Sequence, residues 1–293
     1  MQYVIAVFRQ SFLASLFRPF ESTWNWFRSD PRHYQALFQL LFLLYGMFVL
    51  GWEIPLLRFN LVVLACLAVQ TLFIVFKTKD WTSLKSALIS SFSLLLMMQA
   101  NSISTFLIAA ALSVSSKFFL RIRGKHIFNP TNFGIIVTFL LTGDAWISPG
   151  QWGSNGLMLM LIGCTGLVVL LRVKRLDTAF AFLFAFLGFG FVRNVLYLGW
   201  PADFFYHQLT TGSLLLFTFF MITDPKSTPS SRWPRIAWAM AIGAVAFWLS
   251  NTMYVHTAPL WALFFLSPLT PVLDYFFPGK KFQWAPAPES SKS

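Results

Sequence analysis

Residues 56–79 read LLRFNLVVLACLAVQTLFIVFKTK, an apolar run of one helix length that ends in two lysines. A helix needs about 20 apolar residues to cross about 30 Å of hydrocarbon. Cytoplasmic loops of membrane proteins carry an excess of Lys and Arg. The stretch therefore predicts a transmembrane helix, Leu56–Phe76, whose carboxyl end lies in the cytoplasm.

The composition of the whole chain points the same way. Hydrophobic residues make up 57% of the 293 residues and charged residues 11%, and the mean hydropathy is +0.65. A soluble domain of this composition would lack a polar surface. Hydropathy and length predict an all-α integral membrane protein with about ten transmembrane helices. The other spans are placed at Gln35–Trp52, Leu84–Met98, Ser102–Leu120, Pro130–Leu141, Leu157–Leu171, Asp177–Tyr197, Ser213–Ile222, Pro234–Ser250 and Ala258–Phe276.

The basic residues give these spans a direction. Lys and Arg follow the second, fourth, sixth and eighth spans, and only Arg58 and Arg193 fall on the other side. This alternation predicts that both chain ends are cytoplasmic. The net charge of +12 then lies at one membrane face, where anionic lipid is the ordinary partner. We therefore expect a lipid bilayer, and no nucleic acid, as the basic chain's partner.

Three segments follow from the same pattern. Residues 1–33 mix Phe, Leu and Val with arginines and predict an amphipathic segment lying on the cytoplasmic leaflet. Residues 34–278 form the predicted ten-helix transmembrane domain. Residues 279–293, rich in Pro and Ser, predict a disordered cytoplasmic tail.

Two of the predicted spans are unusually short. The fifth, from Pro130, and the eighth, from Ser213, have too few residues to cross the hydrocarbon at 1.5 Å per residue. Such half-helices occur in folds built from inverted repeats, where they place backbone dipoles near a site inside the protein. The spans divide into five plus five, so we expect a 5+5 inverted repeat. The alternative is a tilted helix whose ends the pattern misplaces.

The sequence shows no evident ligands for a redox metal and no evident carboxylates for an ion relay. Cys66 and Cys164 lie within spans, without the spacing and number of thiolates that an iron–sulfur cluster needs. The histidines form no pair at ligand spacing, so we expect no metal site. The acidic residues lie at span ends, which argues against a buried proton or sodium relay in this chain alone.

Three short motifs stand out against the apolar background. Phe128-Asn-Pro130 opens the fifth span, Thr223-Asp-Pro225 closes the eighth, and Pro271-Val-Leu-Asp-Tyr275 lies near the end of the last span. In kind, order and topological place they resemble motifs of the NqrB/RnfD family, over roughly residues 77–280. That family comprises membrane subunits of the sodium-translocating NADH:quinone reductase and of the Rnf electron-transport complex.

The resemblance implies a flavin-dependent electron-transport subunit in the bacterial cytoplasmic (inner) membrane, linked to ion translocation. It would be a component of a membrane oxidoreductase and not a complete enzyme, with other membrane and redox subunits as partners and quinone as a further contact. In the family, FMN is joined to a Thr between the fifth and sixth spans. The corresponding loop here, 143–156, contains no Thr, so we do not expect covalent FMN.

A non-covalent flavin, riboflavin or FMN, remains compatible with the residues. An isoalloxazine needs an apolar slot with a few amide or hydroxyl partners. The candidate residues are Phe128, Asn129, Thr131, Asn132, Thr223 and Asp224. A structural role competes with this one, because Asn-Pro is typical of a helix N-cap and Asp-Pro of a helix end.

Two further functions stay open beside the redox subunit. One is a transporter or channel for a small, flavin-type molecule on the same fold. The other is a scaffold subunit without a cofactor of its own.

Overall fold

The computed structural model describes residues 27, 29–147, 156–203 and 211–284. The predicted interfacial segment falls almost entirely on residues 1–26 and the predicted tail largely on residues 285–293, so both lie outside the described residues. Most of the loop 143–156 is outside them as well. The described part of the chain is mostly helical.

Helices coincide with every span that hydropathy predicts. The first half contains α2 (Pro31–Phe48), α3 (Leu56–Phe73) with the π-helical turn η1 (Ile74–Thr78), the 3-10 turn η2 (Trp81–Ser83), α4 (Leu84–Met97), α5 (Ile103–Phe119) and α6 (Pro130–Thr142). The second half contains α7 (Gly156–Val173), α8 (Leu176–Phe191) with the π-helical turn η4 (Val192–Tyr197), α10 (Gly212–Leu216) with the π-helical turn η5 (Phe217–Met221), α11 (Arg232–Thr252), α12 (Ala258–Leu266) and α13 (Leu269–Phe276).

Three helical stretches of the described chain are long and apolar enough to cross a membrane. They are Leu56–Thr78, Gly156–Val173 and Leu176–Tyr197. Their outward faces are apolar, as Leu64, Leu72 and Phe76 on the first of them illustrate. A helix that is hydrophobic on its exposed side as well as its buried side is suited to lipid and not to water. The protein is therefore a membrane protein.

The last predicted span is not a single helix. The sequence predicts one helix over Ala258–Phe276, but α12 ends at Leu266 and α13 begins at Leu269. Proline lacks a backbone N–H and clashes with the preceding turn, so Pro268 explains the break. Ser267 closes α12 by donating its hydroxyl to the carbonyl of Leu263 (2.6 Å). The short helices α6 and α10–η5, by contrast, have nearly the predicted bounds.

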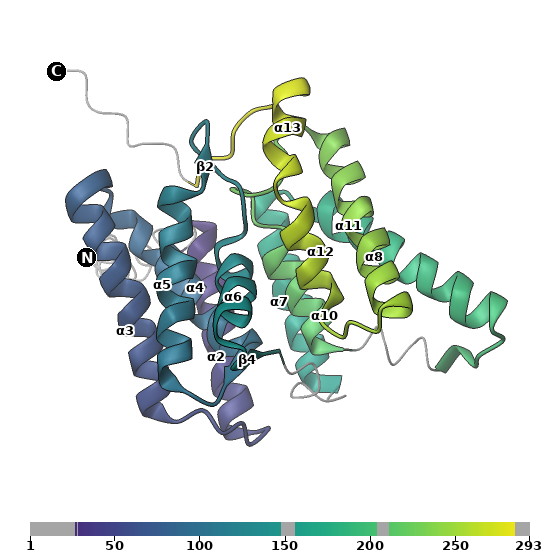
Figure 1. Cartoon of the computed structure of the whole chain (residues 1–293), viewed down its shortest axis with the longest axis horizontal. Helices are drawn as coiled ribbons and strands as arrows, with labels where there is room; N and C mark the ends of the chain where they lie inside the picture. The colour runs from purple at the N-terminus through teal and green to yellow at the C-terminus, as the bar shows by residue number, and fades with distance from the viewer. Residues whose placement is uncertain (1–26, 28, 148–155, 204–210, 285–293) are drawn as a thin grey trace, which may run out of the picture.

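The two halves lie side by side, with α6, α7, α10 and α12 near the middle (Figure 1). Corresponding helix pairs pack in each half: α3 on α5 and α8 on α11, then α5 on α6 and α11 on α12. We call the end of the bundle at which α2, α4 and α6 begin the basic end, because the basic residues that follow the even-numbered spans lie there.

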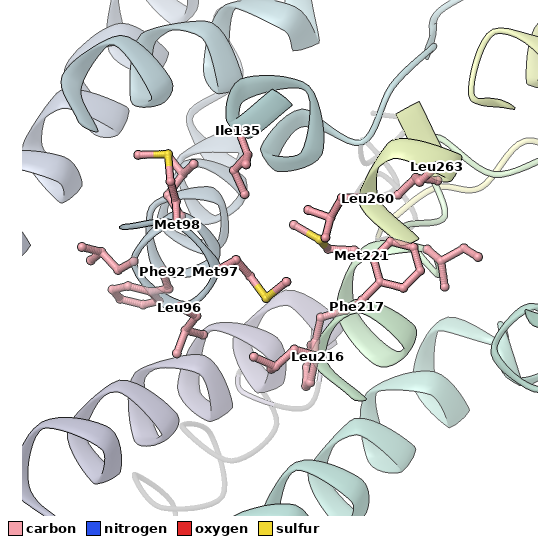
Figure 2. Packing of buried hydrophobic residues seen from close by; sticks show 14 of the residues in the cluster. Phe92, Leu96, Met97, Met98, Ile135, Leu216, Phe217, Met221, Leu260 and Leu263 are labelled. Atoms are coloured by element: carbon pink, nitrogen blue, oxygen red, sulfur yellow. The ribbon is translucent and has the colours of Figure 1, made fainter. Parts of the chain in front are cut away.

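A hydrophobic core joins the halves. Met97 at the end of α4 faces Leu216, Phe217 and Met221 of α10–η5, together with Leu260 of α12 (Figure 2). All five side chains are buried. Flexible methionines fill an irregular space between helices well. The end of α4 therefore meets α10–η5 across an apolar centre.

A pair of short antiparallel strands lies at each end of the bundle. At the end opposite the basic end, β1 (Gln99–Ala100) pairs antiparallel with β4 (Ala145–Trp146). Asp144 beside them accepts hydrogen bonds from the Thr105 hydroxyl (2.6 Å) and from the backbone of Ser102 (3.1 Å). These bonds lower the pKa of Asp144 to about 2. At the basic end, β2 (Arg121–Ile122) and β3 (Lys125–His126) form a hairpin whose tight turn has positive φ at Arg123 and Gly124.

Candidate functional site

Asn129 joins the start of α6 to the end of η5. As the N-cap of α6, its Oδ1 accepts a hydrogen bond from the backbone N–H of Asn132 (3.1 Å), and Pro130 follows at the first helical position. The same side chain donates from Nδ2 to the carbonyl of Met221 (3.1 Å). One amide therefore satisfies a helix start and, far away in sequence, the last turn of another helix.

Asp224 orders the turn that follows η5. Its Oδ1 accepts from the backbone N–H of Lys226 (3.1 Å) and its Oδ2 from the Ser227 hydroxyl (3.1 Å). Burial raises the pKa of Asp224, although these hydrogen bonds and the neighbouring lysines oppose the shift. Thr223 closes the last turn by donating its hydroxyl to the carbonyl of Phe219 (2.7 Å). Asn129 thus has the N-cap role that its motif predicts, and Asp224 orders the turn that follows the helix end.

A polar cavity of about 80 Å³ opens where these two helix ends meet, at the basic end. Asn129, Thr131, Thr223 and Asp224 line it, as the sequence predicts for a common site. Three segments far apart in sequence complete the wall. They contribute Arg32 and Gln35 from α2, Ser86, Ile89, Ser90 and Ser93 from α4, and Val169, Leu170 and Val173 from α7. Aromatic and apolar contacts come from Phe219, Phe220 and Met221 of η5 and from Trp284.

Two candidate residues have their side chains elsewhere. Phe128 packs at a tilt against Phe133 and stacks on Phe264, with ring centroids 5.2 and 5.1 Å away. Asn132 is fully buried and donates from Nδ2 to the carbonyl of Leu260 (3.2 Å), which ties α6 to α12. Neither residue lines the cavity. The structure therefore does not bring these two candidates together with the other four.

The cavity has a row of serines that the motifs do not reveal. Ser86, Ser90 and Ser93 lie on one face of α4, because residues spaced by three or four share a helix face. Lys117, at the last turns of α5, is only 4% exposed. Its Nζ donates to the Ser90 hydroxyl (2.8 Å), to the Ser86 hydroxyl (3.2 Å) and to the Ser86 carbonyl (3.0 Å). The sequence pattern counts Lys117 with the cytoplasmic turn, whereas its side chain points inward.

The surroundings of the cavity are electropositive. Arg32 pairs with Asp30 (2.7 Å), while Lys117 has only hydroxyl and carbonyl partners among the hydrogen bonds of the described residues. His126 lines the cavity, and burial, together with the nearby charges of Lys117 and other cations, lowers its pKa to about 3. A neutral imidazole and several cations favour a ligand with acceptor atoms or negative charge.

The cavity also limits the size of a ligand. A water molecule needs roughly 10–15 Å³ of such space, so about 80 Å³ holds a group of five to eight waters. One quinone ring or the polar edge of a flavin fits this volume, whereas a complete three-ring flavin requires the helix ends to move apart. The second amide hydrogen of Asn129 and the hydroxyl of Thr131 are donors that suit the carbonyl oxygens of either ring system.

A known protein family matches part of the chain. The family model described as NQR2, RnfD, RnfE family matches residues 137–283, half of the chain. The matched region begins within α6 and includes η5, Thr223, Asp224 and α13. No curated protein matches the chain.

Proposed function

Since the chain belongs to the NQR2, RnfD, RnfE family and is a membrane subunit of an NQR- or Rnf-type complex, we propose that its basic-end cavity binds a redox ring. The ring is a non-covalent flavin, riboflavin or FMN, or the head group of a quinone. The subunit would pass electrons within the complex, linked to ion translocation. Partner subunits would supply the NADH site and the metal centres.

The convergence of two distant motifs is the observation that carries this proposal. Asn129 and Asp224 lie about a third of the chain apart in sequence, yet Asn129 Nδ2 bonds to Met221, three residues before Asp224. Two helix ends that share a bond enclose the cavity on one side, and the serine row of α4 encloses it on the other. Binding sites of this kind lie between helices and combine apolar walls with a few convergent polar groups.

The lining residues have separable tasks in this proposal. The hydroxyl of Thr131 would donate to a ring carbonyl, while Phe219 and Trp284 would cover the ring faces. Lys117, behind the serines, would favour a ring that gains negative charge. A bound flavin or quinone would supply the electron-accepting chemistry, and the protein would set its position and electrostatic surroundings.

We further propose ten membrane spans in a 5+5 inverted repeat, with both termini cytoplasmic in the bacterial inner membrane. The matching helix contacts of the two halves support the repeat: α2 packs on α4 as α7 packs on α10–η5. The gathering of basic residues at one end of the bundle supports the orientation. Fluorescent and alkaline-phosphatase fusions at residues 79 and 101 would report opposite sides if this topology holds.

The first test is spectroscopic. The full-length chain is purified in mild detergent, and its absorption and fluorescence are recorded before and after acid precipitation, with organic extraction for quinone. Flavin in the supernatant or extracted quinone supports the proposal. Flavin retained in the pellet would mean covalent attachment and contradict the non-covalent part. A folded protein without either compound, also in membranes containing its complex, would exclude the redox site.

Thr131 offers the cleanest variant, because Asn129 and Asp224 also stabilise helix ends. Thr131→Val removes one hydroxyl from the cavity wall and leaves both caps intact. Loss of one hydrogen bond should weaken ring retention roughly 3- to 10-fold. Thr138→Val, two turns further along α6 and away from the cavity, is the matched control and should retain the ring. Asn129→Leu and Asp224→Leu should lose the ring and part of the folded protein together.

A second cavity favours one alternative, the transport of a small molecule. It has a volume of about 130 Å³ at the end opposite the basic end, and Ser213, His256 and Thr257 are among its lining residues. The α10–η5 helix contributes to both cavities, with Ser213 at its start and Met221 at its end. Uptake of riboflavin by proteoliposomes containing only this chain would support the transporter, and a redox subunit would show none.

A further inference from the structure

A further hollow lies at the basic end, toward the carboxyl terminus, and shares only His126 with the lining of the redox cavity. It has a volume of about 190 Å³ and is formed by the β2–β3 hairpin, the segment before α11, α13 and residues 278–281. In Figure 1, β2 and α13 lie beside each other at this end. The lining residues that matter here are Arg123, Lys125, Ser230, Thr270, Asp274 and Lys281.

The single carboxylate of this hollow is already fully engaged. Asp274 Oδ2 accepts from Lys125 Nζ (2.6 Å), and Asp274 Oδ1 accepts from the backbone N–H of Ser230 (2.7 Å). Lys125 also donates to the Ser230 hydroxyl (3.1 Å). Lys125 and Asp274 cancel in charge, and Asp274 is the only acidic residue among the described residues that line the hollow. The framework is therefore ordered before any ligand arrives.

Two cations of the hollow remain without a carboxylate. Lys281 donates to the backbone carbonyl of Arg123 (2.9 Å), and the guanidinium of Arg123 lies 5.0 Å from the ring centre of Tyr275. The ion pairs of the described residues include neither cation. The hollow thus has a net charge near +2, with His126 neutral because burial and the neighbouring cations lower its pKa.

A buried hydroxyl gives an independent indication of a ligand. Thr270 is 0% exposed, lines the hollow, and its Oγ1 has no hydrogen-bond partner in the described structure. Buried polar groups are nearly always hydrogen-bonded, so each exception requires an explanation. A hydroxyl beside two uncompensated cations is well placed to donate to an anionic oxygen.

We propose that this hollow binds a phosphate group, carried by an anionic phospholipid or by a soluble phosphate ester. The planar donors of a guanidinium match phosphate oxygens in pairs, which Arg123 would supply. Lys281 adds a point charge, and Thr270 adds a hydroxyl donor. The general excess of Lys and Arg at a cytoplasmic face accounts for the charge alone, but not for an ordered hollow that leaves a buried hydroxyl without a partner.

The test uses the full-length chain in detergent and two probes. One is glycerol 3-phosphate, titrated at constant ionic strength and followed by the midpoint of thermal unfolding. The other is phosphatidylglycerol added to the micelles, with phosphatidylcholine as comparison, followed by native mass spectrometry of retained lipid. Stabilisation by the soluble ester alone identifies a soluble ligand, and retention of phosphatidylglycerol alone identifies a lipid. If neither probe has an effect, the proposal is overturned.

Matched variants separate a site from diffuse attraction. Arg123→Gln with Lys281→Gln should weaken binding of the effective probe at least 10-fold. Arg121→Gln with Lys280→Gln removes the same charge from adjacent positions that do not line the hollow and should change binding less than 2-fold. Equal losses in the two double variants would overturn the proposal.

Thr270→Val tests the hydroxyl with little change in shape and should weaken binding roughly 3- to 10-fold. Unchanged binding would place the phosphate outside the hollow and overturn the proposal. Flavin or quinone content of the same preparations should not change, so failure here is distinguishable from failure of the redox site.

Discussion

The helices α4 and α10–η5 occupy corresponding places in their halves and contribute opposite chemistry to the same cavity. The first, α4, presents the hydroxyls of Ser86, Ser90 and Ser93, with Lys117 bonded behind them. The second, α10–η5, has an apolar and aromatic wall and ends at Asp224. Similar packing therefore does not mean similar function: the first half supplies donors and a cation, and the second a carboxylate and ring contacts. Neither half alone forms the site.

The largest effect is expected from a substitution that breaks the ion pair of the second half. Arg235 of α11 bonds through two nitrogens to Asp177 of α8 and is almost fully buried. Asp177→Ala should destabilise the protein by about 3–5 kcal/mol, because it leaves a buried guanidinium without its charge partner. Thermal unfolding in detergent and the monodisperse yield measure this.

The first half has a matched comparison. Asp30 pairs with Arg32 only two residues away and with Lys85, which is partly exposed. Burial alone would raise the pKa of Asp30, but the bonds from Arg32 and Lys85 outweigh it and lower the value. Asp30→Ala should cost less than Asp177→Ala, because water can reach Lys85. Equal costs would mean that both halves depend on their ion pairs alike.

Close helix packing at glycine gives the next effect. A Cβ at Gly243 of α11 would lie 2.7 Å from the carbonyl oxygen of Phe182 and 2.9 Å from the backbone N of Phe186. Backbone cannot yield as a side chain can, so Gly243→Ala should cost about 1–3 kcal/mol. At Gly134 of α6 the nearest atom is the hydroxyl of Ser113, which can rotate.

Gly134→Ala should cost about as much as Gly243→Ala, because the carbonyl oxygen of Ala109 and the Cβ of Ser113 still lie 2.8 and 2.9 Å from the new Cβ after that rotation. Gly163→Ala on α7 is the control, because nothing lies within 4 Å of its Cβ position. It should stabilise the protein by up to about 1 kcal/mol through helix propensity. Chemical denaturation of the three variants gives the order, and a destabilised Gly163→Ala would contradict it.

The sequence predicts the helices better than the site, and the reason is physical. Lipid requires long apolar runs, so α3, α7 and α8 can be read from composition alone. The N-cap of Asn129 is equally local and is confirmed. Pro268 could have indicated the break between α12 and α13, because an internal proline interrupts a helix. The hydropathy signal depends mainly on the length of the apolar run, so it does not show the break between α12 and α13.

The site residues depend on contacts between distant segments, which no local pattern contains. Asn132 is three residues from Asn129 but reaches α12, and Phe128 stacks on Phe264. Lys117 lies at the end of a span, where a count of charges assigns it to a loop, yet its side chain turns inward to α4. The spacing of Ser86, Ser90 and Ser93 was the one available signal, since it predicts a polar face on an apolar helix.

A smaller effect concerns pH where the two halves meet. The pKa of His126, from the first half, is lowered to about 3 by burial and by the charges of Lys117, Arg121 and, from the second half, Lys226. The unfolded chain binds a proton below pH 6.5 while the folded chain does not, so stability is present above that pH and falls below it. The loss should be about 1 kcal/mol between pH 6.5 and 5.5. His126→Gln should flatten this part of the profile, measured by unfolding at several pH values. An unchanged slope would assign the pH dependence to other groups.

The smallest expected effect concerns how α4 and α10–η5 are held against their neighbours α2 and α7. In the first half, Gln39 of α2 donates from Nε2 to the Ser93 hydroxyl (2.8 Å). In the second, Gly166 of α7 meets the ring of Phe219, and a Cβ there would lie 2.6 Å from it. Gln39→Leu should change stability by no more than about 1 kcal/mol. The variant removes an amide oxygen that has no partner, and Ser93 lines the cavity, where water can replace the lost donor.

Ser93→Ala should cost more than Gln39→Leu, because it leaves the buried amide of Gln39 without an acceptor. Denaturant unfolding of both single variants and of the double variant gives the coupling between them. If Gln39→Leu is instead the more damaging change, the polar bond itself positions α4. The two halves would then differ in how α4 and α10–η5 are held, and not only in what these helices present to the cavity. A hydrogen bond would hold α4 in the first half, and an aromatic ring packed against a glycine would hold α10–η5 in the second.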